Sequence, residues 1–144
     1  MKIRLSMLSI VLIVVLAMTA SAAGKDEIRK YFNNAATEVK ATENPVEKRA
    51  ILDKSFERMT LALEMVQQSP MISGDDLTGI DRIKSMIREK QNEMAGANGF
   101  ERVQDMQLNL FADYVVQDME QADQIISISL VTLLLIILII VLLV

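Results

Sequence analysis

The chain has 144 residues, which leaves room for a single domain, and its formal net charge is −4. It contains no Cys, no His and no Trp. These absences exclude disulfides, Ser-His-Asp and Cys-His hydrolases, structural zinc sites and histidine-ligated haem, and the acidic balance argues against a nucleic-acid partner.

Residues 1–23 have the three parts of a secretory signal peptide. Lys2 and Arg4 supply positive charge, an apolar run covers residues 8–17, and an Ala-x-Ala sequence at residues 20–22 offers the small side chains of a cleavage site. We therefore predict a signal peptide, and we expect the rest of the chain to be exported. The alternative is an uncleaved membrane anchor, because the longer stretch of residues 5–23 just reaches across a bilayer when it is tilted.

Residues 24–124 repeat apolar side chains every three or four positions, which is the period of an amphipathic helix. No segment shows sustained period-two alternation, so we predict an all-α domain. The expected apolar stripes are Ile28, Phe32, Ala35 and Val39; Leu52, Phe56, Met59, Leu63 and Val66; Ile80, Ile83, Ile87 and Met94, with Lys90 in one turn; and Val103, Met106, Leu110, Phe111 and Tyr114.

Breaks between these stripes divide the domain. Asn44-Pro45 ends the first helix and opens the second, since Pro fits the first helical turn. A polar stretch from Ser69 to Asp76 separates the second helix from the third, with Asp75 or Asp76 as the expected cap, and Gly96–Gly99 separates the third from the fourth. Short connections favour antiparallel neighbours, so we predict a small antiparallel bundle of three to four helices with heptad-type, coiled-coil-like seams.

Residues 125–144 contain no charged residue, no Gly and no Pro. About 20 such residues rise roughly 30 Å as a helix, which matches the hydrocarbon thickness of a bilayer, and we predict a C-terminal transmembrane anchor. No breaker follows Phe100, so we expect the last bundle helix to continue into the anchor as one helix of about 45 residues. A removable tail of the glycolipid-anchor kind is the alternative, although no cluster of small residues precedes a polar spacer.

The flank of the anchor indicates its orientation. Basic residues are favoured on the cytoplasmic side, and the nearest base before residue 125 is Arg102. The residues between them include Asp113, Asp118, Glu120 and Asp123. Together with the leader, this predicts a single-pass protein of the cell membrane whose body, residues 24–124, lies on the extracytoplasmic (periplasmic) side.

The candidate chemical groups are few. The adjacent pair Asp75 and Asp76 begins an oxygen set for Ca²⁺ or Mg²⁺, but the spacing of an EF-hand loop is absent, so helix capping is favoured. The candidates for a Ser-Lys hydrolase are Ser69, Ser73, Ser85, Lys84 and Lys90, yet adjacent helical residues do not face each other and no glycine-rich turn presents the serines. We predict no catalytic, cofactor-binding or metal site, and no enzyme activity.

Apolar residues beyond the stripes indicate contact surfaces. Leu61, Ala62 and Met65 widen the apolar face of the second helix and mark a partner surface where they stay exposed. Several methionines either line an adaptable binding groove or fill the core, and their spacing favours the core. These methionines are Met59, Met65, Met71, Met86, Met94 and Met106.

We predict an exported, membrane-anchored protein that acts through protein contacts, as an accessory subunit, scaffold or homo-oligomer. The predicted anchor, the apolar stripes of the helices and the lack of catalytic groups all favour this interpretation. The alternative is a membrane-active or pore-forming small protein that uses its C-terminal apolar helix. No polar stripe runs the length of that segment to line a water path, which counts against the alternative.

Overall fold

The structure is a computed structural model that describes residues 27–126 and 128–143. Over these residues the chain forms helices and no strand, which confirms the all-α class. The elements are α2 (Glu27–Ala41), α3 (Pro45–Gln67), α4 (Gly74–Ala95), the short 3₁₀ helix η2 (Asp105–Gln107), α5 (Leu108–Ile125) and α6 (Leu130–Leu143). The predicted signal peptide, residues 1–23, lies outside the described residues.

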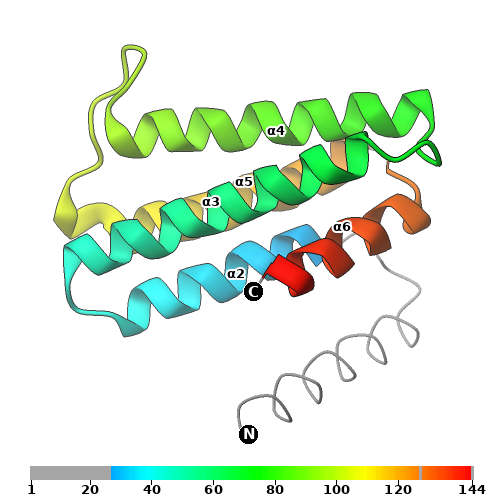
Figure 1. The fold of residues 1–144 in the computed structure, drawn as a ribbon. Coiled ribbons are helices and arrows are strands. Elements are labelled where there is room, and N and C mark those ends of the chain that lie inside the picture. Colours follow the sequence, from blue (N-terminus) through cyan, green and yellow to red (C-terminus); the bar gives the residue numbers. More distant parts are fainter. Residues whose placement is uncertain (1–26, 127, 144) are drawn as a thin grey trace, which may run out of the picture.

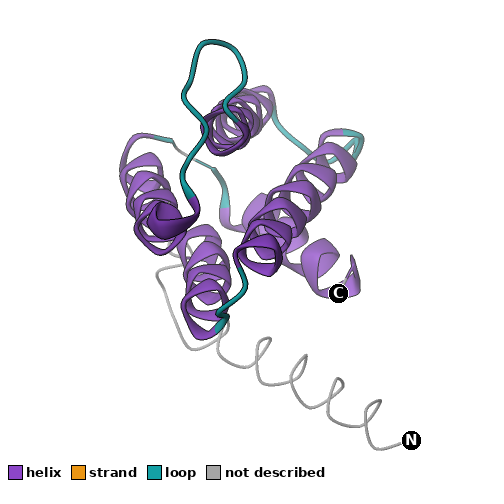
Figure 2. Ribbon diagram, turned by 90° about the vertical axis from the view of Figure 1, so that its left-hand side faces the viewer, coloured by secondary structure: helices purple, strands orange, loops and turns teal. Residues whose placement is uncertain are grey.

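The long helices α2 to α5 lie side by side as a bundle (Figure 1). α3 contacts α2, α4, α5 and α6, whereas α5 packs mainly on α2 and only sparsely on α4. Figure 2 looks roughly along the helices and shows them arranged around a common interior. α3 is therefore the central element, and the predicted helical bundle is confirmed.

The helix ends follow from local side-chain chemistry. Asn44 caps α3 by accepting a hydrogen bond from Val46 N, and Pro45 occupies the first turn, as predicted. The cap of α4 is Ser73, whose side chain accepts from Asp76 N, so the prediction that Asp75 or Asp76 caps this helix was wrong. Both aspartates lie in the first turn instead, where a negative charge suits the helix dipole.

Three of the four predicted apolar stripes form the core. Every residue predicted for the stripes of α2, α3 and α4 is buried, including Lys90. Ring contacts extend across helices, with the Phe32 and Phe56 centroids 5.9 Å apart. The fully enclosed side chains include Phe32, Phe56, Leu52, Met59, Leu63, Ile80 and Ile87. α3 provides more of the fully buried side chains than any other described helix.

The last bundle helix begins later than predicted. Gly96 ends α4 with a φ of +74°, and the chain then runs through a loop to η2. Arg49 of α3 fixes this loop by donating to the carbonyl oxygen of Val103 and, at 2.8 Å, to the carboxylate of Asp105. α5 consequently starts at Leu108.

That later start also changes which face of α5 is buried. Of the predicted fourth stripe only Phe111 is buried and Val103 is partly buried, whereas Met106 and Leu110 are 93% and 71% exposed and Tyr114 is 42% exposed. The stripe that packs inward comprises Leu108, Phe111, Ala112, Val115, Met119 and Ala122. The prediction for this helix was therefore wrong in phase, because it began counting in residues that are not helical.

The expected single helix from Phe100 into the membrane segment is also contradicted. α5 ends at Ile125, Ile126 is extended (φ −95°, ψ 121°), and a separate helix α6 begins at Leu130. α6 turns back onto the bundle and packs against α3 and, to a smaller extent, α2 (Figure 1). None of the described helices is both long enough and apolar enough to cross a membrane, and the predicted C-terminal transmembrane helix is therefore not shown.

The α3 stripe supports a test of the core. Leu63 is fully buried, whereas Leu61 on the same helix is 45% exposed. We expect Leu63→Asp to lower the free energy of unfolding by several kcal/mol, since an unpaired charge becomes buried, and Leu61→Asp to change it by less than about 0.5 kcal/mol. Chemical denaturation followed by circular dichroism measures both, and equal stabilities would contradict the burial of Leu63.

Candidate functional site

The most unusual element of the structure is α6, a 14-residue helix without a charged side chain. Its inward face comprises Thr132, Leu133, Ile136 and Ile140, which are all buried. These residues recur every three or four positions, so one side of the helix is covered by the bundle. The helix is nevertheless apolar on the opposite side as well, and an amphipathic surface helix would be polar there.

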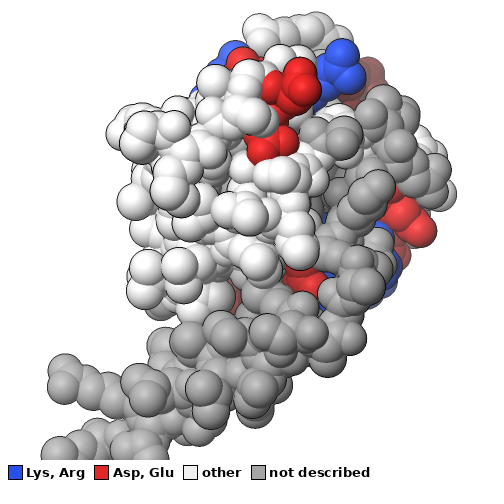
Figure 3. Space-filling model, turned by 90° about the vertical axis from the view of Figure 1, so that its right-hand side faces the viewer, with Lys and Arg blue, Asp and Glu red and all other residues white. Residues whose placement is uncertain are grey.

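The outward face of α6 exposes large apolar side chains. We name this set, Leu130, Val131, Leu134, Leu138 and Leu142, the outer stripe. Their exposed fractions run from 37% at Leu134 to 76% at Leu142. Figure 3, which views the molecule from the side on which α6 lies, shows a broad area without charged residues. Contiguous exposed apolar surface of this kind marks a place where a protein contacts a partner or a membrane.

A buried carboxylate holds the start of α6. Asp76, which is 6% exposed, accepts a hydrogen bond from Ser129 N at 2.9 Å, and its second oxygen accepts from the hydroxyls of Ser129 and Thr132, each at 2.6 Å. The Ser129 hydroxyl oxygen in turn accepts from Thr132 N at 3.4 Å, the position of a helix cap. We call this set, Asp76, Ser129 and Thr132, the Asp76 cap.

The Asp76 cap favours an ionised carboxylate. Burial acts to raise the pKa of Asp76, but hydrogen bonds from Ser129, Thr132 and Ser73 outweigh it and hold the pKa below its ordinary value. The carboxylate therefore accepts hydrogen bonds at neutral pH and also places a negative charge at the positive end of α6. In this way α4 accepts the backbone N–H of Ser129 and positions the Ser129 hydroxyl, which caps α6.

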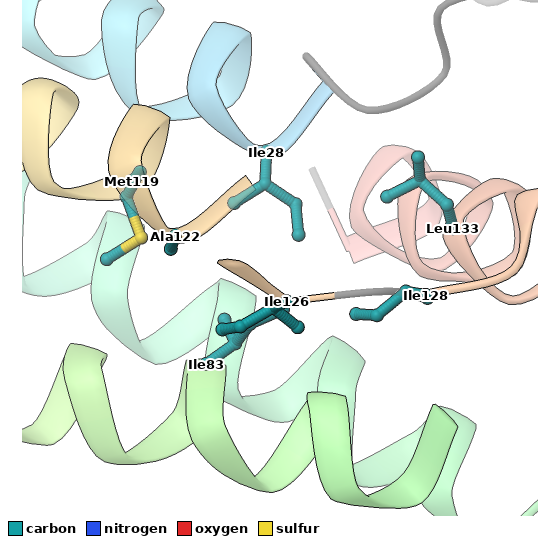
Figure 4. Close-up of a pocket in the computed structure, with 7 residues that line it drawn as sticks. All are labelled: Ile28, Ile83, Met119, Ala122, Ile126, Ile128 and Leu133. Carbon is teal, nitrogen blue, oxygen red and sulfur yellow. The ribbon is translucent and has the colours of Figure 1, made fainter. Parts of the chain in front are cut away.

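An apolar pocket lies beside the Asp76 cap, where α2, α4, α5 and the connection to α6 meet (Figure 4). Its lining residues are Ile28, Ile83, Met119, Ala122, Ile126, Ile128 and Leu133. The enclosed volume is about 20 Å³, whereas small-molecule sites hold roughly 300–1,000 Å³. The pocket is thus a packing junction that seats the α5–α6 connection, and it has no room for a ligand.

A second, open groove runs between α4 and α5, where these helices touch little. It has a volume of about 570 Å³. Its lining residues are Thr78, Asp81, Arg82, Ser85, Met86, Asp118, Gln121, Ala122 and Ile126. The groove mixes both signs of charge with apolar side chains. Asp81 accepts from Gln67 at 2.6 Å, so part of its polar lining is already paired within the protein.

Lys90 ties α4 to α5 near one end of this groove. Its ammonium lies 2.5 Å from Asp118 and 2.9 Å from Glu93, and 4.0 Å from the centre of the Tyr114 ring. Burial lowers the pKa of Lys90, but hydrogen bonds to Asp118, Glu93 and Tyr114 outweigh it and raise the pKa above its ordinary value. Lys90 is therefore a structural cation, because a general base or nucleophile needs a depressed pKa.

The serines considered for a Ser-Lys hydrolase have separate local roles. Ser73 caps α4, and Ser69 accepts from Met71 N at 3.4 Å. Lys84 donates to Gln67 at 3.0 Å and pairs with Glu64 at 3.6 Å, while Ser85 lines the groove between α4 and α5. Within the described part of the chain, none of these serines forms a hydrogen bond with a lysine. Asp76, by contrast, binds two hydroxyls that sequence reasoning did not connect to it.

The methionines divide between two environments. Met59 and Met94 are buried in the core, Met86 is partly buried, and Met65, Met71 and Met106 are 46%, 71% and 93% exposed on three different elements. The expectation that they fill the core holds for only part of the set. Of the three residues proposed as a partner surface on α3, Ala62 is buried, whereas Leu61 and Met65 stay exposed.

The part of the chain that the structure describes contains no group of three or more acidic residues placed to hold a metal ion. No family model, no curated protein and no solved structure matches the sequence. The features that bear on function are therefore α6, the Asp76 cap and the exposed apolar side chains.

The Lys90 cluster predicts a specific loss of stability. We expect Lys90→Met to lower the free energy of unfolding by about 3 kcal/mol, because Asp118 and Glu93 then lose their buried partner. Lys30→Met is the matched control, since the Lys30 side chain is 54% exposed and pairs with Glu27 at 3.4 Å, one turn away on the same helix. That control is expected to change stability by less than about 0.5 kcal/mol, and equal effects would show that Lys90 contributes no more than a surface lysine.

Tyr31 predicts how stability depends on alkaline pH. Its hydroxyl donates to Ser55 O at 2.9 Å, and burial raises its pKa from 10.0 to about 12, against a smaller opposing effect of Arg58. Between these two pH values the folded chain keeps a proton that the unfolded chain releases, so stability is full below pH 10 and falls as the pH rises toward 12. The absorbance of tyrosinate measures the titration of the Tyr31 hydroxyl directly.

The chain has two tyrosines, which makes assignment possible. We expect the titration step near pH 12 to disappear in Tyr31→Phe. If that step persisted in Tyr31→Phe, the burial of Tyr31 would be contradicted.

Proposed function

We propose that this is a membrane-associated helical protein, in which residues 125–144 attach the chain to a lipid bilayer and the helical bundle acts through protein contacts as an accessory subunit or scaffold. The observation that supports it most directly is the outer stripe, an exposed face built from Leu and Val alone on a helix without charge. A helix that is apolar all round is typical of the interior of a protein or of a membrane.

The composition of the outer stripe favours lipid over a protein as its partner. The cores of protein interfaces are enriched in Tyr, Trp, Phe, Met and Arg, and the outer stripe contains none of these. It also has no hydrogen-bonding side chain to give specificity. Contact with the hydrocarbon of a bilayer requires only apolar surface, and the outer stripe consists of apolar surface alone.

Length decides what kind of contact is possible. The 14 residues of α6 rise about 21 Å, which is less than the roughly 30 Å of a hydrocarbon core. While α6 lies on the bundle, its outer stripe suits a position along the bilayer surface. To span a bilayer, the whole apolar segment of residues 125–144 would have to form one helix. We propose this state for an anchored, single-pass form of the protein whose bundle lies on the extracytoplasmic side.

The bundle also offers a surface for a protein partner. Leu61 and Met65 lie one turn apart on α3 and are 45% and 46% exposed. A pair of apolar side chains spaced four residues apart is the anchor pattern by which helices recognise each other. Lys90 is held in ion pairs with Asp118 and Glu93 and is no activated nucleophile, which fits a role in binding for this part of the bundle. A second copy of this chain or an unrelated helical protein fits this surface.

The membrane contact is tested by flotation of the full-length protein with phosphatidylcholine vesicles. We expect the wild type to float and the double variant Leu134→Lys, Leu138→Lys to bind at least tenfold more weakly, because a loss of about 1.4 kcal/mol already changes an equilibrium tenfold. Both side chains point outward, so the charged ends reach solvent and folding is preserved.

Met106→Lys is the matched control, because Met106 is an exposed apolar residue outside α6, 93% exposed. It is expected to float like the wild type. A wild type that stays in the aqueous fraction, or variants that float equally well, would contradict the proposal. Dye release from the same vesicles is expected to stay at background, and release that requires residues 125–144 would favour the membrane-active alternative.

A further inference from the structure

We propose that Asp76 is the fixed half of a latch that holds residues 125–144 on the bundle, and that the docked and membrane-inserted positions of this segment exclude each other, so that Asp76 controls how much of the protein is anchored. This inference rests on the proposed membrane contact and goes beyond it, because it names the residue that opposes insertion. The contacts of the Asp76 cap and the two faces of α6 are its basis.

The polar residues of the apolar segment are used for docking. Residues 125–144 contain Ser127, Ser129 and Thr132 as their only polar side chains. Ser127 lies outside the described residues, and the other two both donate to the same oxygen of Asp76 at 2.6 Å. Asp76 itself lies in the first turn of α4. A simple anchor would need no such partner in the soluble part of the protein.

The two positions compete for the same side chains. Leu133, Ile136 and Ile140 contribute to the bundle core when α6 is docked, so they cannot contact lipid at the same time. The break at Ile126 is part of the docked form, since the chain must turn there to bring Ser129 to Asp76. A continuous membrane helix would need this break to become helical and the three hydrogen bonds to be given up.

Opposing free energies make the balance sensitive. In water the docked form covers one face of α6 and leaves the outer stripe exposed, whereas a bilayer covers both faces. The buried contacts with α3 and α2 oppose insertion. So do the hydrogen bonds to the Asp76 carboxylate, because a hydrogen bond to a charged acceptor is stronger than one to a neutral acceptor. Since lipid favours release and the Asp76 cap favours docking, a single substitution at Asp76 shifts the population toward the membrane.

Substitution of Asp76 gives the first test. We expect Asp76→Ala to raise the fraction of full-length protein that resists alkaline carbonate extraction from phosphatidylcholine vesicles at least fivefold. Carbonate removes surface-bound protein and leaves inserted protein. Asp75→Ala is the matched control, because Asp75 is the exposed neighbour on the same turn, and it is expected to behave like the wild type. Equal resistance of Asp76→Ala and wild type, with normal flotation of both, would overturn the latch and leave the proposed function standing.

A covalent replacement of the latch removes the concern that Asp76→Ala perturbs the bundle. The chain has no Cys, so the pair Asp76→Cys and Ser129→Cys can form a single disulfide in place of the hydrogen bond between these residues. We expect the oxidised protein to be extracted by carbonate and the reduced protein to resist it. Equal resistance in both states, with the disulfide verified, would overturn the latch, whereas failure of the wild type to float would overturn the proposed function itself.

Discussion

The hydrogen bonds between the Asp76 carboxylate and the start of α6 decide the shape of the C-terminal half of the structure. A charge-free helix in water needs one face covered and its first N–H groups satisfied. The bundle covers one face through α3 and α2. At the start of the helix Asp76 accepts the Ser129 N–H and the hydroxyls of Ser129 and Thr132, and the Ser129 hydroxyl oxygen accepts the Thr132 N–H. The turn at Ile126 follows from both requirements, because α6 reaches Asp76 only by reversing direction after α5.

The remainder of the bundle places Asp76 where it is needed. Ser73 fixes the start of α4, so that Asp76 lies one turn inside the helix next to the α5–α6 connection. Lys90 pairs α4 with α5 through Asp118 even though these helices pack sparsely. The Lys90–Asp118 ion pair therefore links α4 to α5 where few other contacts join the two helices. The open groove lies between them in the same region.

Sequence reasoning succeeded where the apolar period ran between clear breakers. Asn44-Pro45 separates the stripes of α2 and α3, Ser73 marks the start of α4 and Gly96 its end. These breakers fixed the phase of the α3 and α4 stripes from both ends and that of the α2 stripe from its C-terminal end. It failed after Gly99, because Arg49 holds residues 103–105 out of a helix from a distance of about 55 positions along the chain. Ser129 did carry a local signal, since Ser immediately before an apolar run is typical of a helix N-cap. Asp76 lies 53 positions before Ser129 and 56 before Thr132, which no local pattern reveals.

The sequence alone does not separate a transmembrane helix from one that docks on the bundle, and the reason is general. Burial against protein and burial in lipid reward the same side chains, so an apolar run of bilayer length does not by itself tell which of the two covers it. What separates them is the far side of the helix: a helix meant only for a protein core would be covered or polar there, whereas α6 exposes five large apolar residues. The docked helix therefore retains the property from which the membrane anchor was predicted, and the Asp76 carboxylate is the feature that a permanent anchor would not require.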